Sequence, residues 1–260
     1  MKKTGILLIT AAVFLLLPAQ CRARLEIGVG AWDQNIRGDL YYNLYASPDV
    51  ADVEDDLGLD SDVRGVAYLK WELPILPNLY LGVTPMKFEG RQIRDTSFEF
   101  GEYTFLADRP LKSKMVLNHY DIGFYYSLKL PDVASMKEVK LDLGLNLRTA
   151  ELDVRVSGSV ATDDGIRHAR ESKDYTLPIP MLYGAVQITP VDKISLEVEG
   201  RGVTLKGDHL FSFLSRIKFY VQKNFFIAAG YRFDYIRLDE DDLNIDSTVG
   251  GVLCETGFEF

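Results

Sequence analysis

The segment 251–260 alternates strictly in side-chain character and ends on an aromatic residue, Phe260. One face carries Val252, Cys254, Thr256, Phe258 and Phe260, and the other carries Gly251, Leu253, Glu255, Gly257 and Glu259. An aromatic strand edge invites aggregation in a soluble protein, whereas the last strand of a closed barrel pairs with the first and leaves no edge in lipid. The C-terminus therefore predicts a bacterial outer-membrane β-barrel, with Phe258 and Phe260 as the signal that the barrel-assembly machinery engages.

The N-terminal residues have the pattern of a secretory signal peptide. Lys2 and Lys3 precede an apolar run over 6–17, and Pro18 ends this run. The run is shorter than the about 20 apolar residues that a transmembrane helix needs. We expect cleavage after Ala23, which divides the chain into a signal peptide, 1–23, and an outer-membrane β-barrel domain, 24–260.

Cys21 offers an alternative, a lipoprotein that carries lipid on this sulfur. The bulky Gln20 argues against it, because such sites have a small residue before the cysteine. Cleavage after Ala23 leaves Cys254 as the single cysteine of the mature chain, so we expect no internal disulfide.

The composition excludes a helical membrane protein. Hydrophobic residues make up 47% of the chain, yet no apolar run after residue 23 is long enough for a helical span. A barrel has such an average composition because lipid-facing and lumen-facing residues alternate. The net charge of −9 argues against nucleic acid as a partner. The 14 Tyr and 14 Phe residues are enough for aromatic girdles at both membrane surfaces.

Alternation recurs along the chain and predicts its strands. The clearest strands are 119–128, 139–148, 194–202, 212–221 and 225–235, and the weaker ones are 25–32, 63–73, 79–88, 176–188 and 248–260. We place Pro178 and Pro180 at the start of their strand, outside the membrane, because proline cannot donate to a ladder. The sequence thus predicts an all-β fold, a single transmembrane antiparallel up-and-down β-barrel of about ten strands, with eight or twelve as alternatives.

The alternation also assigns each side chain to a face. In the strand 139–148, Leu143 is expected to face lipid, and Asp142 and Gly144 to face the lumen. Replacement of Leu143 by Arg should therefore be costly, whereas replacement of Gly144 by Ser should be tolerated in a polar lumen.

The connections between the strands fall into two kinds that alternate along the chain. Short connections are expected at 74–78, 189–193 and 222–224, an intermediate one at 129–138, and long polar loops at 33–62, 89–114, 157–175, 203–211 and 236–247. Within one of these loops, a hairpin from Ser97 to Leu106 can extend above the membrane. Outer-membrane barrels have short periplasmic turns and longer extracellular loops, so we expect both termini to be periplasmic.

Several short motifs occur in an order that resembles a family of uncharacterised outer-membrane β-barrel proteins of Gram-negative bacteria. They are Leu76-Pro77-Asn78, Phe98-Glu99-Phe100-Gly101, Asp121 with Tyr125-Tyr126, Leu141-Asp142-Leu143-Gly144-Leu145, Met181-Leu182-Tyr183, Gly230-Tyr231-Arg232 and Phe258-Glu259-Phe260. The resemblance spans almost the whole mature chain. It implies a barrel in the cell envelope and supplies no catalytic residues.

Charged residues on the inward faces form the best candidate site. Inward positions carry Arg64, Lys70, Glu72, Lys140, Asp142, Arg148, Glu197, Glu199, Arg201, Arg216, Lys218, Arg232 and Asp234. Neighbouring strands carry opposite signs, which favours cross-strand pairs. Because a barrel of about ten strands is narrow, these charges should fill the lumen as a network.

Catalysis has weaker support in the sequence. His119 and Asp121 lie on one inward face and are the only candidates for a general base and its partner. His168 and His209 fall in expected loops, and Asp208-His209 lacks the Asp-x-His spacing of proteases that resemble omptins. We expect neither a cofactor nor a metal centre, and an enzymatic activity is not favoured.

Two expected loops are acidic, and they leave divalent cations as candidate partners. They contain Asp49, Asp52, Glu54, Asp55, Asp56, Asp60 and Asp62, and Asp239, Glu240, Asp241, Asp242 and Asp246. Hard cations favour such oxygen clusters, but neither loop has the spacing of a calcium-binding loop. Solvated carboxylates near a lipopolysaccharide surface are the simpler interpretation, with outer-membrane lipid and lipopolysaccharide as the expected surroundings.

Three function classes are compatible with these sequence patterns. The first is a small barrel with a charge-filled lumen, with a structural or interaction role through its extracellular loops. The second is a narrow channel or a carrier of a small ligand, and the third is an outer-membrane lipid hydrolase or protease. A conductance measurement separates the first two classes.

Overall fold

The computed structural model describes residues 23–42, 51–130, 136–205, 207–240 and 243–260. Its strands are β1 (Arg24–Tyr42), β2 (Ala51–Asp52), β3 (Asp62–Glu72), β4 (Asn78–Thr84), β5 (Lys87–Ile93), β6 (Phe98–Phe100), β7 (Tyr103–Phe105), β8 (Pro110–Leu130), β9 (Glu138–Thr162), β10 (Gly165–Val191), β11 (Ile194–Leu205), β12 (Asp208–Gln222), β13 (Phe225–Glu240) and β14 (Leu243–Glu259). None of the described residues forms a helix with the length and apolar character needed to cross a membrane. The expected signal peptide lies outside the described residues, apart from Ala23.

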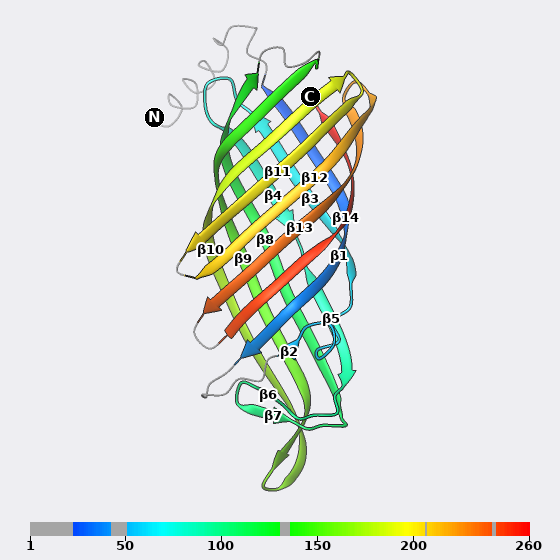
Figure 1. Cartoon of the computed structure of the whole chain (residues 1–260), viewed down its shortest axis with the longest axis vertical. Coiled ribbons are helices and arrows are strands. Elements are labelled where there is room, and N and C mark those ends of the chain that lie inside the picture. Colours follow the sequence, from blue (N-terminus) through cyan, green and yellow to red (C-terminus); the bar gives the residue numbers. More distant parts are fainter. Residues whose placement is uncertain (1–22, 43–50, 131–135, 206, 241–242) are drawn as a thin grey trace, which may run out of the picture.

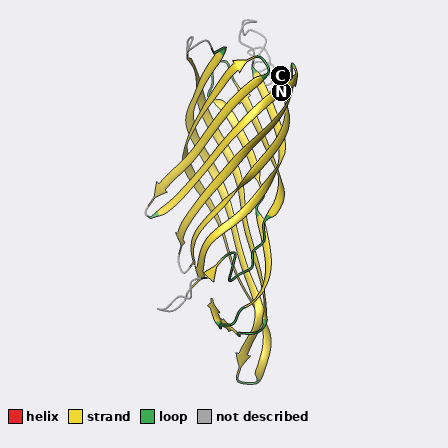
Figure 2. Cartoon of the chain, turned by 45° about the vertical axis from the view of Figure 1, so that its right-hand side comes forward, coloured by secondary structure: helices red, strands yellow, loops and turns green. Residues whose placement is uncertain are grey.

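The strands close into an antiparallel ring (Figures 1 and 2). Each ring strand pairs with its neighbour in the order β1, β3, β4, β8, β9, β10, β11, β12, β13 and β14, and β14 pairs back onto β1. β5 follows β4 along the same edge of β8. β4 pairs with β8 before Pro85, and β5 pairs with β8 after it. The prediction of an up-and-down barrel of about ten strands is confirmed.

The first and last described strands meet at one end of the barrel, since β1 begins where β14 ends. We call this the terminal end of the barrel and the opposite end the distal end. The expected short connections at 74–78, 189–193 and 222–224 lie at the terminal end. At the distal end β9 and β10 project as a long hairpin that turns at Asp163 and Asp164 (Figure 1).

Several expected loops are strands. β9 has 25 residues and β10 has 27, so the prediction of a loop over 157–175 is wrong. The segments 203–211 and 236–247 likewise belong mostly to β11–β12 and β13–β14. Ladder pairing continues in these segments well beyond the length that a bilayer requires, which is about 9–11 residues for a tilted strand.

The two prolines of β10 lie inside this strand and not at its start, so that prediction is also wrong. β10 pairs with β11 only from Leu182 onward, and Pro178 and Pro180 come just before that point. They pair with Thr149 and Leu147 of β9 on the other side. The missing amide donors are tolerated because β10 has no β11 partner at their level.

The distal end is covered by inserted segments. The expected hairpin within 97–106 is confirmed, since β6 pairs with β7 from Phe98↔Phe105 to Phe100↔Tyr103. β7 is joined to β9 at Phe105↔Val160. The segment that follows β2 bridges to β5 at Leu59↔Gly90.

The outward face of the ring carries a belt of apolar side chains. It includes Ile27, Val29, Leu81, Val83, Ile122, Phe124, Leu143, Leu145, Leu182, Val186, Leu196, Val198, Phe213, Ile217, Ile227, Tyr231, Val252 and Phe258, all exposed. Leu69 of β3 connects the belt across the ladder between Ile27 and Leu81. Outer-membrane barrels present such a belt to lipid.

Apolar residues change faces along the strands. In β9, Leu143, Leu145 and Leu147 point outward, whereas Leu152 and Val154 are buried inside. The outward positions beyond Leu147 are polar. The distal parts of the strands are therefore built like a soluble sheet, with an apolar inside and a polar outside.

The interior consequently has two halves. The distal half is a hydrophobic core built from Trp32, Ile36, Leu40, Val53, Leu57, Met86, Phe88, Phe98, Phe100, Phe105, Leu111, Met115, Leu117, Leu152, Val154, Val156, Val160, Leu210, Ile236, Leu238, Ile245 and Val249, among others. Buried charges occupy the terminal half. The prediction of a lumen filled with charge is wrong for the distal half.

Gly144 shows why the expected tolerance of a serine there is wrong. A Cβ at this position would lie 2.1 Å from the carbonyl oxygen of Phe124 and 2.6 Å from Cα of Tyr125. The inward face of β9 is thus in close contact with β8 at this point, and there is no space for a larger residue.

Candidate functional site

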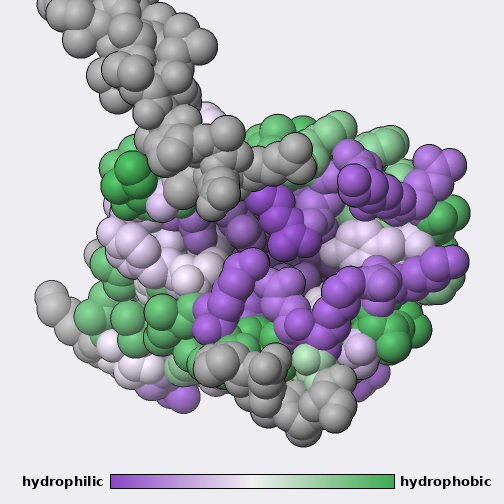
Figure 3. Space-filling model, turned by 90° about the horizontal axis from the view of Figure 1, so that it is seen from above, coloured by the Kyte–Doolittle hydropathy of each residue, from purple (hydrophilic) through white to green (hydrophobic). Residues whose placement is uncertain are grey.

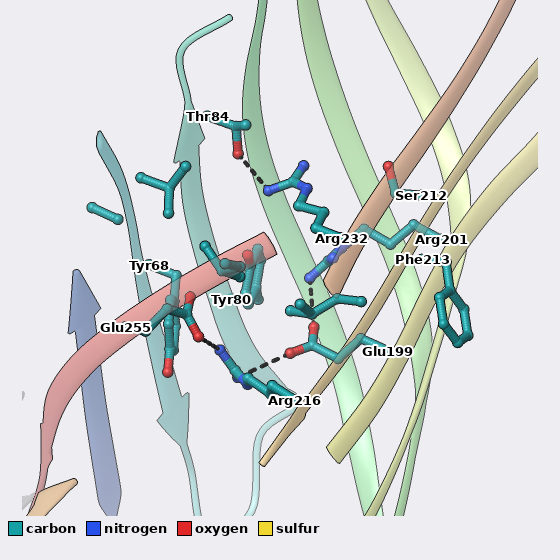
Figure 4. A pocket seen from close by; sticks show the side chains of 14 residues that line it. Tyr68, Tyr80, Thr84, Glu199, Arg201, Ser212, Phe213, Arg216, Arg232 and Glu255 are labelled. Carbon is teal, nitrogen blue, oxygen red and sulfur yellow. Dashed lines mark hydrogen bonds and ion pairs between the residues drawn. The ribbon is translucent and has the colours of Figure 1, made fainter. Parts of the chain in front are cut away.

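Arg216 of β12 is the centre of the largest group of buried ion pairs (Figure 4). Its Nε and Nη2 donate to Oε2 of Glu197 over 3.0 and 2.9 Å. Nη2 also donates to Oε1 of Glu199 over 3.1 Å, and Nη1 donates to Oε2 of Glu255 over 2.6 Å. One guanidinium thus connects β11 with β14 along one wall of the barrel, over β13.

Two lysines, one from β3 and one from β12, approach the same carboxylates. Lys70 of β3 pairs with Glu197 and donates to Oε1 of Glu199 over 2.8 Å. Nζ of Lys218 lies 2.9 Å from Oε2 of Glu197 and also pairs with Glu26 of β1. Glu197 and Glu199 therefore each have more than one cationic neighbour.

The group, which we call the central network, is balanced in charge. Its basic members are Lys70, Arg201, Arg216 and Lys218, and its acidic members are Glu26, Glu197, Glu199 and Glu255. Equal numbers of opposite charges avoid the cost of an uncompensated charge in a low-dielectric interior.

Tyrosine rings hold the two arginines of the central network. The guanidinium carbon of Arg201 lies 4.3 Å from the ring centre of Tyr80 and 5.0 Å from that of Tyr183. Arg216 lies 4.6 Å from the ring centre of Tyr68. Such cation–π contacts fix the planar heads and fill the space between the ion pairs.

A second group lies beside the central network. Arg148 of β9 makes a bidentate pair with Asp121 of β8, with 2.9 Å from Nε to Oδ1 and 3.1 Å from Nη2 to Oδ2. Its Nη1 donates to Oγ of Ser212 over 2.7 Å. Asn146 donates to Oδ1 of Asp121 over 2.6 Å. This group joins β8 and β9 to β12 on the far side of the barrel.

Arg232 of β13 marks the boundary with the hydrophobic core. It donates to Oδ2 of Asp234 and to Oγ1 of Thr84, over 2.9 Å in each case. Its guanidinium carbon lies 4.7 Å from the ring centre of Trp32, a member of that core. The charged half therefore ends at this level.

Toward the terminal end a smaller chain of polar contacts continues. Lys140 pairs with Glu72 and lies 3.7 Å from Oδ2 of Asp142. Asp142 accepts a hydrogen bond from Ser127 over 2.6 Å. Arg64 is the one predicted lumen residue that lies apart from these groups, half-buried near the distal end and paired with Asp62.

The candidates for catalysis do not form an accessible site. His119 is 1% exposed, and its Nδ1 lies 3.8 Å from Oδ2 of Asp234. Asp121 is engaged by Arg148 and Asn146. A general base must reach its substrate, and both side chains are enclosed by the barrel.

The remaining histidines and the acidic loops are at the distal surface. Nδ1 of His209 lies 3.1 Å from Oγ1 of Thr204, and Asp208 accepts the backbone amide of Asp239. His168 is exposed. Asp52 accepts the backbone amides of two loop residues over 2.9 and 2.7 Å and so stabilises its own turn.

Within the described residues no three His, Cys, Asp or Glu side chains come together in a way that could hold a metal ion. Asp49, Asp241 and Asp242 of the acidic loops lie outside the described residues. Divalent cations at these loops remain a prediction.

Sequence reasoning missed two acidic members of the central network and its aromatic neighbours. Glu26 lies on the inward face of β1 and Glu255 on that of β14. Alternation puts Glu255 on the face opposite Phe260, which is signal enough to include it. The tyrosines are harder to find, because a lumen tyrosine and a girdle tyrosine look alike in a sequence.

The ion pairs leave little free space. The cavity beside Arg201 and Arg216 has a volume of about 20 Å³, which is room for one water molecule. Polar residues also cover the visible part of the opening at the terminal end, with apolar residues around the rim (Figure 3). A larger cavity of about 470 Å³ lies at that mouth, between Arg24, Lys137, Lys193 and Lys223.

The closed ring of strands and its filled interior define an outer-membrane β-barrel. A comparison with solved structures agrees with this class. The outer membrane protease OmpT from Escherichia coli superposes with a TM-score of 0.57 at 8% identity, covering 91% of this chain and 97% of OmpT. The chain therefore has the fold of bacterial outer-membrane β-barrels.

Two other barrels are similar over most of their length but superpose less well. The translocator domain of the autotransporter NalP from Neisseria meningitidis gives a TM-score of 0.43 at 10% identity, covering 99% of this chain and 95% of NalP. The attachment invasion locus protein Ail of Yersinia pestis gives 0.32 at 12% identity, covering 92% and 99%. No family model and no curated protein matches the sequence.

Proposed function

We propose that the protein is a non-conducting integral barrel of the bacterial outer membrane that acts through its distal end, outside the cell. One observation carries this proposal: the interior is closed twice along its axis. The central network leaves room for about one water molecule, and the hydrophobic core lies beyond it. Wide channels need 16 or more strands.

The apolar belt and the positions of the ends support the location and the orientation. The belt offers lipid a surface that a soluble protein would not expose. The start of β1 and the end of β14 share one end, and the strands and inserted segments extend farthest beyond the belt at the other end, as the extracellular parts of known barrels do. The hairpin of β9 and β10 and the inserted segments are then extracellular.

Two alternatives have less support. A narrow channel needs a continuous polar path, and the hydrophobic core interrupts it. A protease or lipid hydrolase needs an accessible base, whereas His119 is enclosed. The activity of OmpT does not transfer with the fold, because unrelated activities share this architecture.

Conductance of the purified protein in planar lipid bilayers tests the proposal. The wild type should give no discrete current steps, with a porin as the positive control for the same preparation. The double variant Arg216→Ala/Glu197→Ala, which opens the central network, should also be silent because the core still closes the distal half. Discrete steps from the wild type would contradict the proposal.

Labelling of single cysteines tests the orientation. In a Cys254→Ser background, Asp164→Cys lies in the distal turn and Lys223→Cys in a turn at the terminal end. A membrane-impermeant maleimide should label Asp164→Cys on intact cells and Lys223→Cys only after the outer membrane is permeabilised. The reverse pattern would show that the barrel is inverted.

A further inference from the structure

Four strands continue beyond the apolar belt as a curved sheet. We call this the distal sheet; it comprises β5 and the segments 110–118 of β8, 149–162 of β9 and 165–177 of β10. Its inner face packs on the hydrophobic core through residues such as Phe88, Met115 and Val154. Its outer face is mostly polar, and the apolar side chains exposed there include Ile93 and Ile166.

Basic residues gather on this outer face by cross-strand register. One outward row across the ladder begins with Arg91 of β5, opposite Lys112 of β8. It continues with Ser157 of β9 and ends with Arg170 of β10. In the next outward row Lys114 is paired with Arg155. These residues line a concave site of about 290 Å³, together with Glu89, Gly90 and Ser113.

The positive charges of this site are only partly compensated. Arg91, Lys112 and Arg170 make no ion pair with any residue in the described part of the chain, whereas Arg155 pairs with Asp153 and Glu89 pairs with Lys87. Five basic side chains and one acidic side chain line the site, in a protein whose net charge is −9.

Two pairs of like charge stand directly opposite each other in the ladder. Arg91 faces Lys112, and Lys114 faces Arg155 on one side and Glu89 on the other, so only the first pair has no acidic residue opposite it. Like charges in opposite positions destabilise a sheet. The central network balances its charges, whereas this site has a basic surplus in an acidic protein, which indicates a ligand that supplies the missing negative charge.

We propose that this surface binds phosphate or sulfate esters carried on a polysaccharide. Arginine forks bind such groups in a bidentate way, and lysines add point charges. Ser157, which lies between Lys112 and Arg170, offers a hydroxyl donor. The volume is close to the lower limit for a small-molecule site and exceeds the need of a bare ion. Since the side chains project from four paired strands, their backbone positions are fixed before the ligand arrives.

The height of the site above the belt selects among anionic ligands. Lys112 is eight residues from Tyr120, which lies at the edge of the belt. That separation is about 27 Å along the strand and, at barrel tilt, about 20 Å above the belt. Lipid headgroups do not reach this level, but sugar chains that carry phosphate or sulfate do.

Binding to the purified barrel in a zwitterionic detergent tests the proposal. The probes are a heparin oligosaccharide, the phosphorylated carbohydrate released from lipopolysaccharide, and uncharged dextran, measured by calorimetry at about 0.15 M salt, where exposed charges are screened over about 8 Å. The wild type should bind at least one anionic probe and not dextran. The double variant Lys112→Gln/Arg170→Gln should bind roughly tenfold more weakly or worse, since each loses a charge-assisted contact.

A matched control removes the same charge elsewhere. Arg37 and Arg237 are exposed distal arginines that lie 3.8 Å from Glu54 and Asp246, so Arg37→Gln/Arg237→Gln should leave affinity within about twofold, as remote surface changes do. Without ligand, Lys112→Gln/Arg170→Gln should also raise the melting temperature, because the repulsion with Arg91 is relieved. A purely structural role predicts a lower melting temperature.

The outcomes separate the sources of the ligand. Binding of the lipopolysaccharide carbohydrate alone assigns the site to the cell's own surface, and binding of heparin alone assigns it to an external glycan; either result upholds the chemistry. Failure of both anionic probes, or equal loss in both double variants, overturns it. Only the extracellular placement of the site rests on the proposed function; binding in detergent is independent of conductance and of orientation.

Discussion

Leu25 and Phe260 exchange both of their backbone hydrogen bonds. The amide of Phe260 donates to the carbonyl oxygen of Leu25 over 2.8 Å, and the amide of Leu25 donates to the carbonyl oxygen of Phe260 over 3.1 Å. The ring is thus closed up to the last residue and has no free edge there. The side chain of Phe260 is 63% exposed and stacks on Phe258 with 6.1 Å between ring centres. We therefore expect the backbone and the aromatic ring of this residue to serve different purposes, closure of the ring and assembly.

Variants of Phe260 separate these purposes. Phe260→Ala keeps both backbone hydrogen bonds and removes the ring, so it should refold in detergent nearly as well as the wild type but reach the membrane in smaller amounts. Deletion of Phe260 also removes the hydrogen bonds, which stabilise by about 1 kcal/mol each. Cell fractionation and the heat-induced mobility shift on detergent gels measure both effects. Equal membrane levels for Phe260→Ala and the wild type would refute a role of the ring in assembly.

Leu143 tests the assignment of the apolar belt to lipid. Its side chain is 50% exposed on the outward face of β9. Leu143→Arg should lower the free energy of unfolding by about 2–4 kcal/mol in lipid vesicles, the cost of a charge near the bilayer midplane. Leu143→Ala is the control, because it shortens the side chain without adding charge and should cost much less. If both variants unfold at the same denaturant concentration, this face does not contact lipid.

Two glycines on opposite faces test the packing of β9 and its neighbours. Gly144→Ala should destabilise the barrel by about 1–3 kcal/mol, the usual cost of overpacking, because its new Cβ meets the backbone of Phe124. Gly184→Ala is the matched control, since the nearest atom to its Cβ is Cδ2 of Leu143 at 3.8 Å. Unfolding by denaturant in vesicles compares the two. A Gly144→Ala protein as stable as Gly184→Ala would show that β8 and β9 are not in this contact.

Arg216 should be the most sensitive residue of the central network. Arg216→Met leaves the carboxylates of Glu197 and Glu255 without their main partner, and removal of one member of a buried ion pair costs about 3–5 kcal/mol. The double variant Arg216→Met/Glu255→Gln should recover part of that loss, because one stranded charge is also removed. A double-mutant cycle on the unfolding free energies measures the coupling. Additive losses would mean that Arg216 and Glu255 are not paired.

The fold could be predicted because apolar and polar residues alternate in every membrane-spanning strand, and the apolar ones always face lipid. Phe124, Leu143 and Ile217 all occur in alternating runs, and all face outward. The positions of the ten strands followed from that pattern. The partners within the central network did not, since Lys70 of β3 contacts Glu197 of β11 across the barrel and register alone does not reveal contacts through a lumen.

The strand ends were missed for a physical reason. Outside the membrane the preferred faces are exchanged, so the apolar positions of β9 shift from odd numbers, as in Leu147, to even numbers, as in Leu152. In β8 they shift from Ile122 to Leu117 in the same way. Such a change of phase looks like the end of a strand, and the polar outward residues look like a loop. The basic site of the distal sheet was hidden in that segment, because Lys112 and Arg170 were both placed in loops.

The division of the interior has a thermal consequence. The hydrophobic core of the distal half exposes apolar area when it unfolds and so contributes a positive heat capacity change, which makes its stabilising effect weaken on cooling. The desolvation penalty of the ion pairs in the terminal half falls as temperature rises. Both interiors are therefore weaker in the cold, but on heating only the ion pairs continue to gain, because hydrophobic stabilisation per unit area reaches a plateau. The distal half is thus the one that should loosen first at high temperature.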